Sequence, residues 1–219
     1  AGAATKFKDL LWRNVVSNFA VIPLQETWDI TSSLFLNGYQ SFSTPAVASS
    51  SERPSGGLLT LILLKLNCKV VSLSQPSVLL QALLLKFAHN YSILLINVYN
   101  APSQSKLLFL PSCMRSILSS KLAHEASGIL CMGDFNLHPC EEVCHSFTTD
   151  DLLRLGHFKH SREGDSYNQI LGEFNLFSSY DFNIQNSTPS TFVGRGCNST
   201  IDYCFLSAPL FSKLVKAEV

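Results

Sequence analysis

Apolar runs broken by short polar segments make up much of the first hundred residues. Four of them are near-continuous, at 57–66, 68–73, 78–87 and 92–99. Such runs predict strands that are covered on both faces. We expect the first two to form a hairpin across residues 65–67. The last two are separated by a turn that contains Asn90.

Two segments have helical spacing instead. Residues 4–18 place apolar side chains on one face, with charged side chains between them. Residues 112–126 predict a second helix, which Pro111 opens as a first-turn residue.

Shorter strands complete the predicted pattern, at 19–25, 129–132, 191–193 and 200–206; the last two flank a hairpin tip at 194–198. Strands with helices on both sides favour a layered α/β sandwich. A length of 219 residues, with no repeat and no linker, predicts one domain over residues 1–219.

Charge and hydropathy exclude several classes of protein. Lys and Arg number 16, and so do Asp and Glu, so the formal net charge is zero. The chain is therefore neither a disordered polyelectrolyte nor a basic tail. Lys65 and Lys86 interrupt the most hydrophobic runs before these reach the ~20 apolar residues of a membrane-spanning helix. We therefore expect no membrane partner.

Cysteine usage indicates the compartment. There are seven cysteines, an odd number, and several lie in apolar runs. Free buried thiols fit this pattern better than a disulfide framework does. We therefore expect a reducing, intracellular location, nuclear or cytoplasmic.

Three polar positions are candidates for chemistry. Glu26 ends a predicted strand, where a carboxylate can hold a metal ion, although a solvated side chain is the commoner case. Asp134 and Asn136 follow another strand and would project to one side if the chain stays extended. One could orient a water and the other could hold a phosphate oxygen; an Asx turn is the plainer alternative.

The third position, Asp202, interrupts an apolar strand. A buried carboxylate needs a partner, because an unpaired buried charge costs several kcal/mol. The alternative to a catalytic role is a structural ion pair or a cap on a loop.

Taken in order, the runs at 25–27, 97–102, 133–136 and 199–203 resemble the endonuclease/exonuclease/phosphatase superfamily. The chain is most similar to the apurinic-endonuclease-like domain of non-LTR (LINE-type) retrotransposons. The likeness covers essentially the whole chain. It implies a four-layered α/β sandwich, here without the family's first and last strands.

The resemblance also implies roles for individual residues. Glu26 would hold Mg²⁺ against the scissile phosphate, and Tyr99 would border the phosphate pocket. Asp134 would orient or deprotonate the attacking water, Asn136 would steady the phosphoryl oxygens, and Asp202 would orient a catalytic histidine. The hairpin resembles a loop that probes the minor groove, which makes three of its residues candidate DNA contacts: Thr191, Arg195 and Asn198.

The implied function is Mg²⁺-dependent nicking of DNA, which leaves a 3′-hydroxyl for target-primed reverse transcription. The partners would be DNA and the rest of a retrotransposon polyprotein, with no small-molecule cofactor. The family also has a first strand with Trp-Asn and a final Ser-Asp-His, and the 17 residues after Asp202 contain no histidine. We therefore expect weak or no nicking from these 219 residues. The alternatives are a non-catalytic remnant or a phosphodiesterase acting on phospholipid or inositol phosphate.

Overall fold

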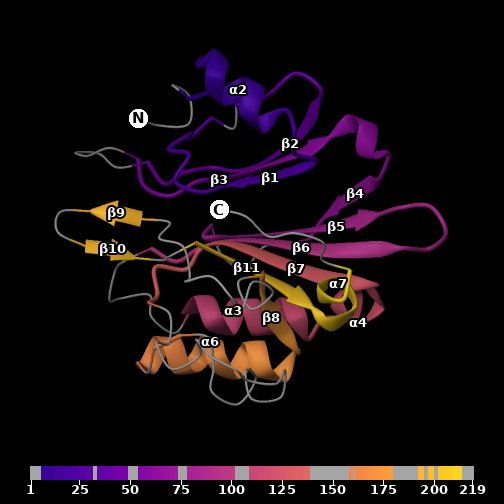
Figure 1. Ribbon diagram of the computed structural model, residues 1–219, viewed down its shortest axis with the longest axis vertical. Coiled ribbons are helices and arrows are strands. Elements are labelled where there is room, and N and C mark those ends of the chain that lie inside the picture. Colours follow the sequence, from indigo (N-terminus) through magenta and orange to yellow (C-terminus); the bar gives the residue numbers. More distant parts are fainter. Residues whose placement is uncertain are drawn as a thin grey trace.

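Four layers of secondary structure stack on one another in the computed structural model (Figure 1). Helix α2 (Leu10–Val16) covers the outer face of a three-stranded sheet, which lies on a six-stranded sheet. Helices α3 (Phe109–Leu118) and α6 (Arg162–Glu173) cover the far face of the larger sheet. The predicted four-layered α/β sandwich is confirmed. The structure describes residues 6–31, 34–48, 54–73, 78–101, 109–138, 158–159, 161–179, 192–194, 197–199 and 202–213.

The smaller sheet has the order β1-β3-β2, with antiparallel pairing throughout. Its strands are β1 (Val21–Leu24), β2 (Tyr39–Thr44) and β3 (Leu58–Leu63). Leu59 and Leu61 alternate along β3 and belong to the apolar cluster under α2. The intervening β3 residues face the other sheet, so this central strand is buried on both faces, as its continuous apolar sequence predicts.

The larger sheet has the order β4-β5-β6-β7-β11-β8. Its strands are β4 (Lys69–Ser72), β5 (Leu80–Lys86), β6 (Ser92–Tyr99), β7 (Gly128–Asp134), β8 (Leu176–Ser178) and β11 (Asp202–Ser207). Only β6 and β7 pair in parallel among these strands, and α3 with α4 (Lys121–Glu125) forms the crossover between them. A short helix, α7 (Ala208–Phe211), follows β11.

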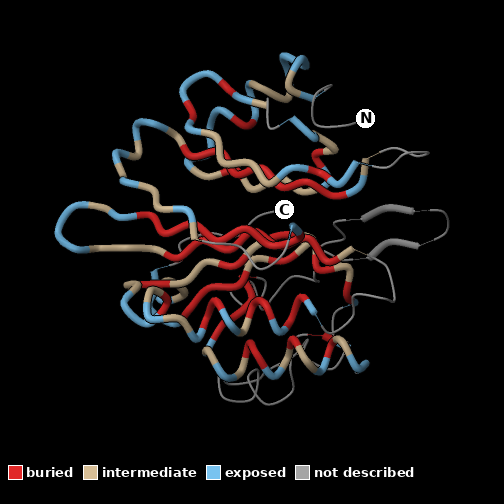
Figure 2. Tube along the Cα trace, turned by 180° about the vertical axis from the view of Figure 1, so that it is seen from behind, coloured by how far each residue is buried: buried red, intermediate tan, exposed pale blue. Residues whose placement is uncertain are grey.

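Buried residues run through every layer (Figure 2), and they form three apolar clusters. Ile62, Leu83 and Leu95 fill the space between the two sheets. Leu94 and Ile96, on the opposite face of β6, belong to the largest cluster, which α3 and α6 cover. Alternate side chains of β6 therefore pack into apolar clusters on opposite faces of the sheet. This is why a strand that is hydrophobic on both faces lies in the middle of the sandwich.

The predicted hairpin across residues 65–67 is wrong. Strand β3 pairs with β1 and β2, whereas β4 pairs with β5 in the other sheet. A 3₁₀ turn, Leu64–Leu66, and the left-handed Asn67 (φ 50°) carry the chain from one sheet to the other. A continuous apolar run identifies a buried strand but does not identify its partners.

Both predicted helices differ from the structure in their bounds. The helix predicted at 4–18 is the shorter α2, which Asp9 caps by accepting hydrogen bonds from the amides of Leu11 and Trp12. The helix predicted at 112–126 is two helices, because Ser120 caps a new helix and accepts from Ala123 N.

The hairpin near the C-terminus also differs from the expectation. It pairs β9 (Phe192–Gly194) with β10 (Cys197–Ser199), while the strand predicted at 200–206 is β11 in the large sheet.

No helix in the described part of the chain is long and apolar enough to cross a membrane. Cys68, Cys113, Cys131 and Cys204 are free thiols. Burial raises the pKa of the Cys204 thiol to about 11, while a hydrogen bond with Ser179 opposes the shift. Cys113 and Cys131 are buried, as the sequence predicts for free thiols in apolar runs, whereas Cys68 and Cys204 are partly exposed.

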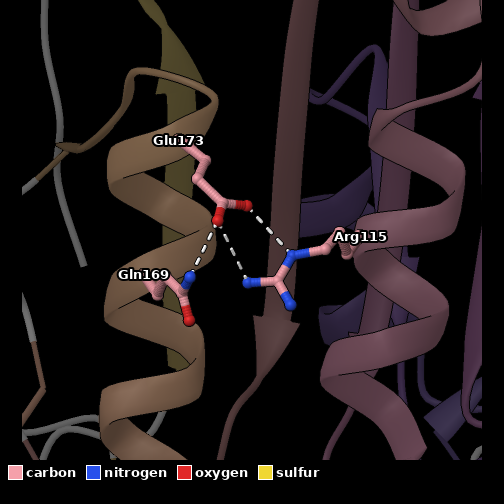
Figure 3. Close-up of polar contacts among 3 residues, drawn as sticks. All are labelled: Arg115, Gln169 and Glu173. Carbon is pink, nitrogen blue, oxygen red and sulfur yellow. Dashed lines mark hydrogen bonds and ion pairs between the residues drawn. The ribbon is translucent and has the colours of Figure 1, made fainter.

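An ion pair joins α3 to α6 on the outer layer. The Arg115 Nε donates to Glu173 Oε2 at 2.9 Å, and Gln169 Nε2 donates to the other carboxylate oxygen (Figure 3). Both charged side chains are about 40% exposed. We expect Glu173→Gln to lower the free energy of unfolding by less than about 1 kcal/mol in urea titrations, because water screens exposed pairs. A loss of several kcal/mol would show that this contact is essential for docking α6.

Candidate active site

Three strands of the large sheet end at one edge and bring polar side chains together there. Tyr99 is the last residue of β6, Asp134 the last of β7 and Asp202 the first of β11. The pairing register places Tyr99 beside Asp134 and Asp134 beside Asp202. Residues paired in this way have side chains on the same face of a sheet. The structure therefore brings these three sequence-predicted residues to one place.

Glu26 joins this cluster from the other sheet. The Tyr99 hydroxyl donates a short hydrogen bond to Glu26 Oε1, although 73 residues separate the two in sequence. Tyr99 is buried, whereas Glu26 is exposed, so the carboxylate lies at the mouth of the space between the sheets.

The backbone around Glu26 is unusual. Strand β1 ends at Leu24, and both Glu26 (φ 49°) and Trp28 (φ 55°) are left-handed. The backbone amide of Thr27 donates to Gly57 O, and that of Trp28 donates to Gly56 O. Left-handed non-glycine residues cost about 1 to 3 kcal/mol each and concentrate at functional sites.

A buried polar network supports the residue before Glu26. The Gln25 side chain donates to Asn97 Oδ1 at 2.6 Å, and Asn97 donates to Thr60 Oγ1 at 3.2 Å. Thr60 in turn donates to Gln81 Oε1 at 2.6 Å. Thr60, Gln81 and Asn97 are almost fully buried and come from both sheets. Satisfied buried networks of this kind fix one arrangement of their elements, and here they fix the approach of β1 to β6.

Residues 134–136 do not stay extended, which was one of the two alternatives that the sequence left open. The strand ends at Asp134, and Asn136 is left-handed (φ 48°). The Asn136 amide donates to Asp134 Oδ1 at 2.9 Å, which makes the Asx turn that the sequence left as an alternative. Phe135, between the two polar residues, is fully buried.

Asn100 fastens this turn to the neighbouring strand. Its amide N–H donates to Asp134 O at 2.8 Å, and its side chain donates to Phe135 O at 2.8 Å. Its own carbonyl accepts from Asn136 Nδ2 at 2.7 Å. The same Asn100 side chain donates to Glu163 Oε1, so α6 is also tied to the turn. The bond to the Asn100 carbonyl fixes one N–H of the Asn136 side-chain amide. Because that amide is planar, the direction of its second N–H is fixed as well.

Burial and nearby charges perturb Asp134 strongly. Burial, followed by the negative charge of Asp202, raises the pKa of Asp134 to about 7, and Glu26 adds to the effect. The hydrogen bonds from Asn136 oppose the shift. An acid that titrates near neutral pH can accept and return a proton under ordinary conditions.

The raised pKa of Asp134 predicts how stability changes with pH in EDTA. Between its ordinary pKa of 3.8 and about 7, the unfolded chain has lost this proton while the folded chain keeps it. Stability therefore falls as the pH rises through this window. We expect Asp134→Asn to remove that fall, so the variant gains stability relative to the wild type between pH 4 and pH 8. Urea titrations would measure this, with the exposed Glu125→Gln as control. A stability difference that does not change with pH would contradict the expectation.

The sequence predicts DNA contacts for three residues near the C-terminal hairpin. Thr191 and Arg195 lie outside the described residues, and Asn198 lies in β10 of the small hairpin. Their contacts with DNA stay predictions.

Sequence reasoning missed two of the residues that organise the site. Asn100 lies in the run 97–102 that supported the resemblance, but that run gave no indication that Asn100 contacts the turn after β7. Glu163 has no sequence signal beyond its place in the first turn of α6. Asn97, in contrast, could have been found as an amide within an otherwise apolar strand.

Comparison with known proteins identifies the fold. No family model matches the chain, and no curated protein sequence matches it. Among solved structures, an AP endonuclease (LMAP) from Leishmania major superposes on 96% of this chain and 75% of its own length, with TM-score 0.67 and 16% identity. An AP endonuclease from Archaeoglobus fulgidus covers 96% of this chain and 85% of its own length, with TM-score 0.65 and 16% identity.

A third match is the 3′ phosphatase NExo from Neisseria, solved bound to a product DNA hairpin. It covers 91% of this chain and 81% of its own length, with TM-score 0.61 and 13% identity. The fold of this chain is thus that of these enzymes, and the fold predicted from the sequence is confirmed.

Proposed function

We propose that this chain hydrolyses phosphodiester bonds in DNA with the help of Mg²⁺, at the site formed by Glu26, Tyr99, Asp134, Asn136 and Asp202. The observation that carries the proposal is the convergence of carboxylates from both sheets at one mouth, next to an amide held in a fixed orientation. A fold shared with AP endonucleases supports it, although fold alone does not specify chemistry.

The donor set fits Mg²⁺. This ion prefers oxygen ligands and uses one or two carboxylates together with water and phosphate oxygens. Glu26 is exposed at the mouth. Its Oε1 accepts the hydrogen bond from Tyr99, and this bond orients the other carboxylate oxygen, Oε2. A bound Mg²⁺ would supply positive charge to the phosphoryl oxygens.

The protein's own residues would carry the proton and orient the phosphate. Asp134 accepts a proton from the attacking water, for which a pKa near 7 is well matched. The water oxygen bonds to phosphorus, the bond from phosphorus to the 3′ oxygen breaks, and that oxygen takes a proton from solvent water, which leaves a 3′-hydroxyl and a 5′-phosphate. The Asn136 side chain, held at one N–H by the Asn100 carbonyl, would donate to a phosphoryl oxygen.

The finer proposal is that nicking by this chain primes reverse transcription of a non-LTR retrotransposon. Its support is the order of the four motif runs in the sequence, at 25–27, 97–102, 133–136 and 199–203. Contacts of Thr191, Arg195 and Asn198 with DNA would direct the nick.

Plasmid nicking tests the proposal. We expect the 219-residue chain to nick supercoiled plasmid slowly in Mg²⁺, since no histidine follows Asp202 in it. A version lengthened by a Trp-Asn strand at its start and a Ser-Asp-His strand at its end should nick at least about 100-fold faster than its own Asp134→Ala variant. EDTA should abolish the difference.

Equal rates from the lengthened chain and its Asp134→Ala variant would overturn the proposal. Asp165→Asn, on the outer helix α6, is the matched carboxylate control and should leave the rate unchanged. A phospholipid substrate assayed in parallel distinguishes DNA from lipid phosphodiesters.

A further inference from the structure

A small pocket lies against the candidate active site. It has a volume of about 200 Å³, and Glu26 forms part of its wall. Phe7, Trp12 and Trp28 provide aromatic walls, and Lys6 is its basic residue. The pocket and the proposed phosphodiesterase site thus share one carboxylate.

The aromatic walls come from two separate elements. The Phe7 and Trp12 rings lie 5.0 Å apart at an angle of 38°, one before and one within α2. Trp28 follows β1 and is set by its left-handed backbone (φ 55°) and by the hydrogen bond from its amide to Gly56 O. Each of the three rings is partly exposed, so aromatic surface is available to a ligand.

We propose that this pocket binds an unpaired nucleobase of the strand that the active site cleaves. The inference rests on the proposed function and adds a specific subsite to it. Bases stack on aromatic side chains whatever their sequence, because every base has a π-face. The Lys6 ammonium supplies the opposite charge for the phosphate of the same nucleotide.

Size and position favour a base over other occupants. The pocket is smaller than the roughly 300 to 1,000 Å³ of sites for drug-sized ligands, and so admits one ring system. Because Glu26 lines both the pocket and the carboxylate cluster, the occupant lies within the same nucleic-acid segment as the scissile phosphate. The pocket wall also contains the Gln25 carboxamide and the Glu26 carboxylate. These polar groups disfavour an acyl chain as the occupant.

The chain provides its own reporter for this site. Trp12 and Trp28 are its only two tryptophans, and both line the pocket. Intrinsic tryptophan fluorescence therefore reports occupancy directly. In EDTA, where hydrolysis is absent, we expect a short single-stranded oligothymidylate to quench it saturably. The matching oligonucleotide with abasic tetrahydrofuran residues, and inorganic phosphate, should not.

Two variants sharpen the test. Trp28→Ala should weaken oligothymidylate binding about 5- to 150-fold, the range expected for loss of one base–aromatic stack. Trp28→Phe keeps an aromatic face and should restore most of the affinity. The control is Phe35→Ala, an aromatic that is 70% exposed outside the pocket, which should bind like the wild type. Circular dichroism checks that each variant is folded.

Failure of this inference is distinguishable from failure of the proposed function. Equal quenching by the base-containing and abasic strands, or unchanged affinity in a folded Trp28→Ala variant, would overturn the base pocket even if nicking is observed. Base-dependent quenching in a protein that never nicks DNA would support the pocket and leave the hydrolytic proposal without support.

Discussion

Gly133→Ala should cost the protein at least about 3 kcal/mol of unfolding free energy, as a severe clash in a buried sheet does. Gly133 has φ 144°, and a Cβ built there would lie 2.0 Å from the backbone oxygen of Val98. The register pairs Gly133 with Val98 on β6, so the clash is with the backbone of the adjacent strand and no rotamer change can relieve it. Strands β6 and β7 would have to separate at the point where Asp134 follows.

The matched control is Gly38→Ala. Gly38 is also left-handed (φ 85°), but nothing lies within 4 Å of a Cβ at that position. Gly38→Ala should lower the free energy of unfolding only by the cost of a left-handed backbone at alanine, about 1 to 2 kcal/mol. Urea unfolding of the two variants separates backbone preference from steric contact, and equal losses would show that β6 and β7 accommodate the methyl group.

The strands of the core were predictable because burial on both sides leaves a continuous apolar sequence. The run at 92–99 is β6 to the residue, and the run at 78–87 differs from β5 only at its ends. Which strands pair could not be predicted in the same way. Strands β3 and β4 follow one another in sequence but belong to different sheets, because that choice depends on which apolar faces pack together.

The candidate site shows the same division. Glu26, Tyr99, Asp134 and Asp202 could each be singled out because a polar residue at a strand end or within an apolar strand is unusual. That Tyr99 donates to Glu26, or that Asp202 pairs with Asp134 and raises its pKa, depends on register between strands far apart in sequence. Local reasoning also could not decide between extended backbone and an Asx turn after Asp134, since both satisfy the pattern.

The other large expected effect concerns Asn100, which the sequence did not mark as a structural centre. Its side chain is the donor to two acceptors, the Phe135 carbonyl and the Glu163 carboxylate, each at 2.8 Å. Burial raises the pKa of Glu163, and the bond from Asn100 lowers it. Asn100→Ala would leave a buried carbonyl and a half-buried carboxylate without this donor. We expect a loss of about 2 to 4 kcal/mol in unfolding free energy at pH 7.

The charge on Glu163 gives this prediction a specific signature. If loss of the donor to a carboxylate is responsible, Asn100→Ala should cost less in a Glu163→Gln background, because a neutral side chain is cheaper to leave unpaired. The cost should also be smaller at lower pH, because protonation of Glu163, whose pKa is raised by burial, removes the charge. The exposed Asn14→Ala on α2 is the control and should change stability by less than about 0.5 kcal/mol. A loss that is the same at pH 7 and at lower pH and in both backgrounds would assign the effect to packing around Phe135, and the tie between α6 and the turn after β7 would then have no energetic role.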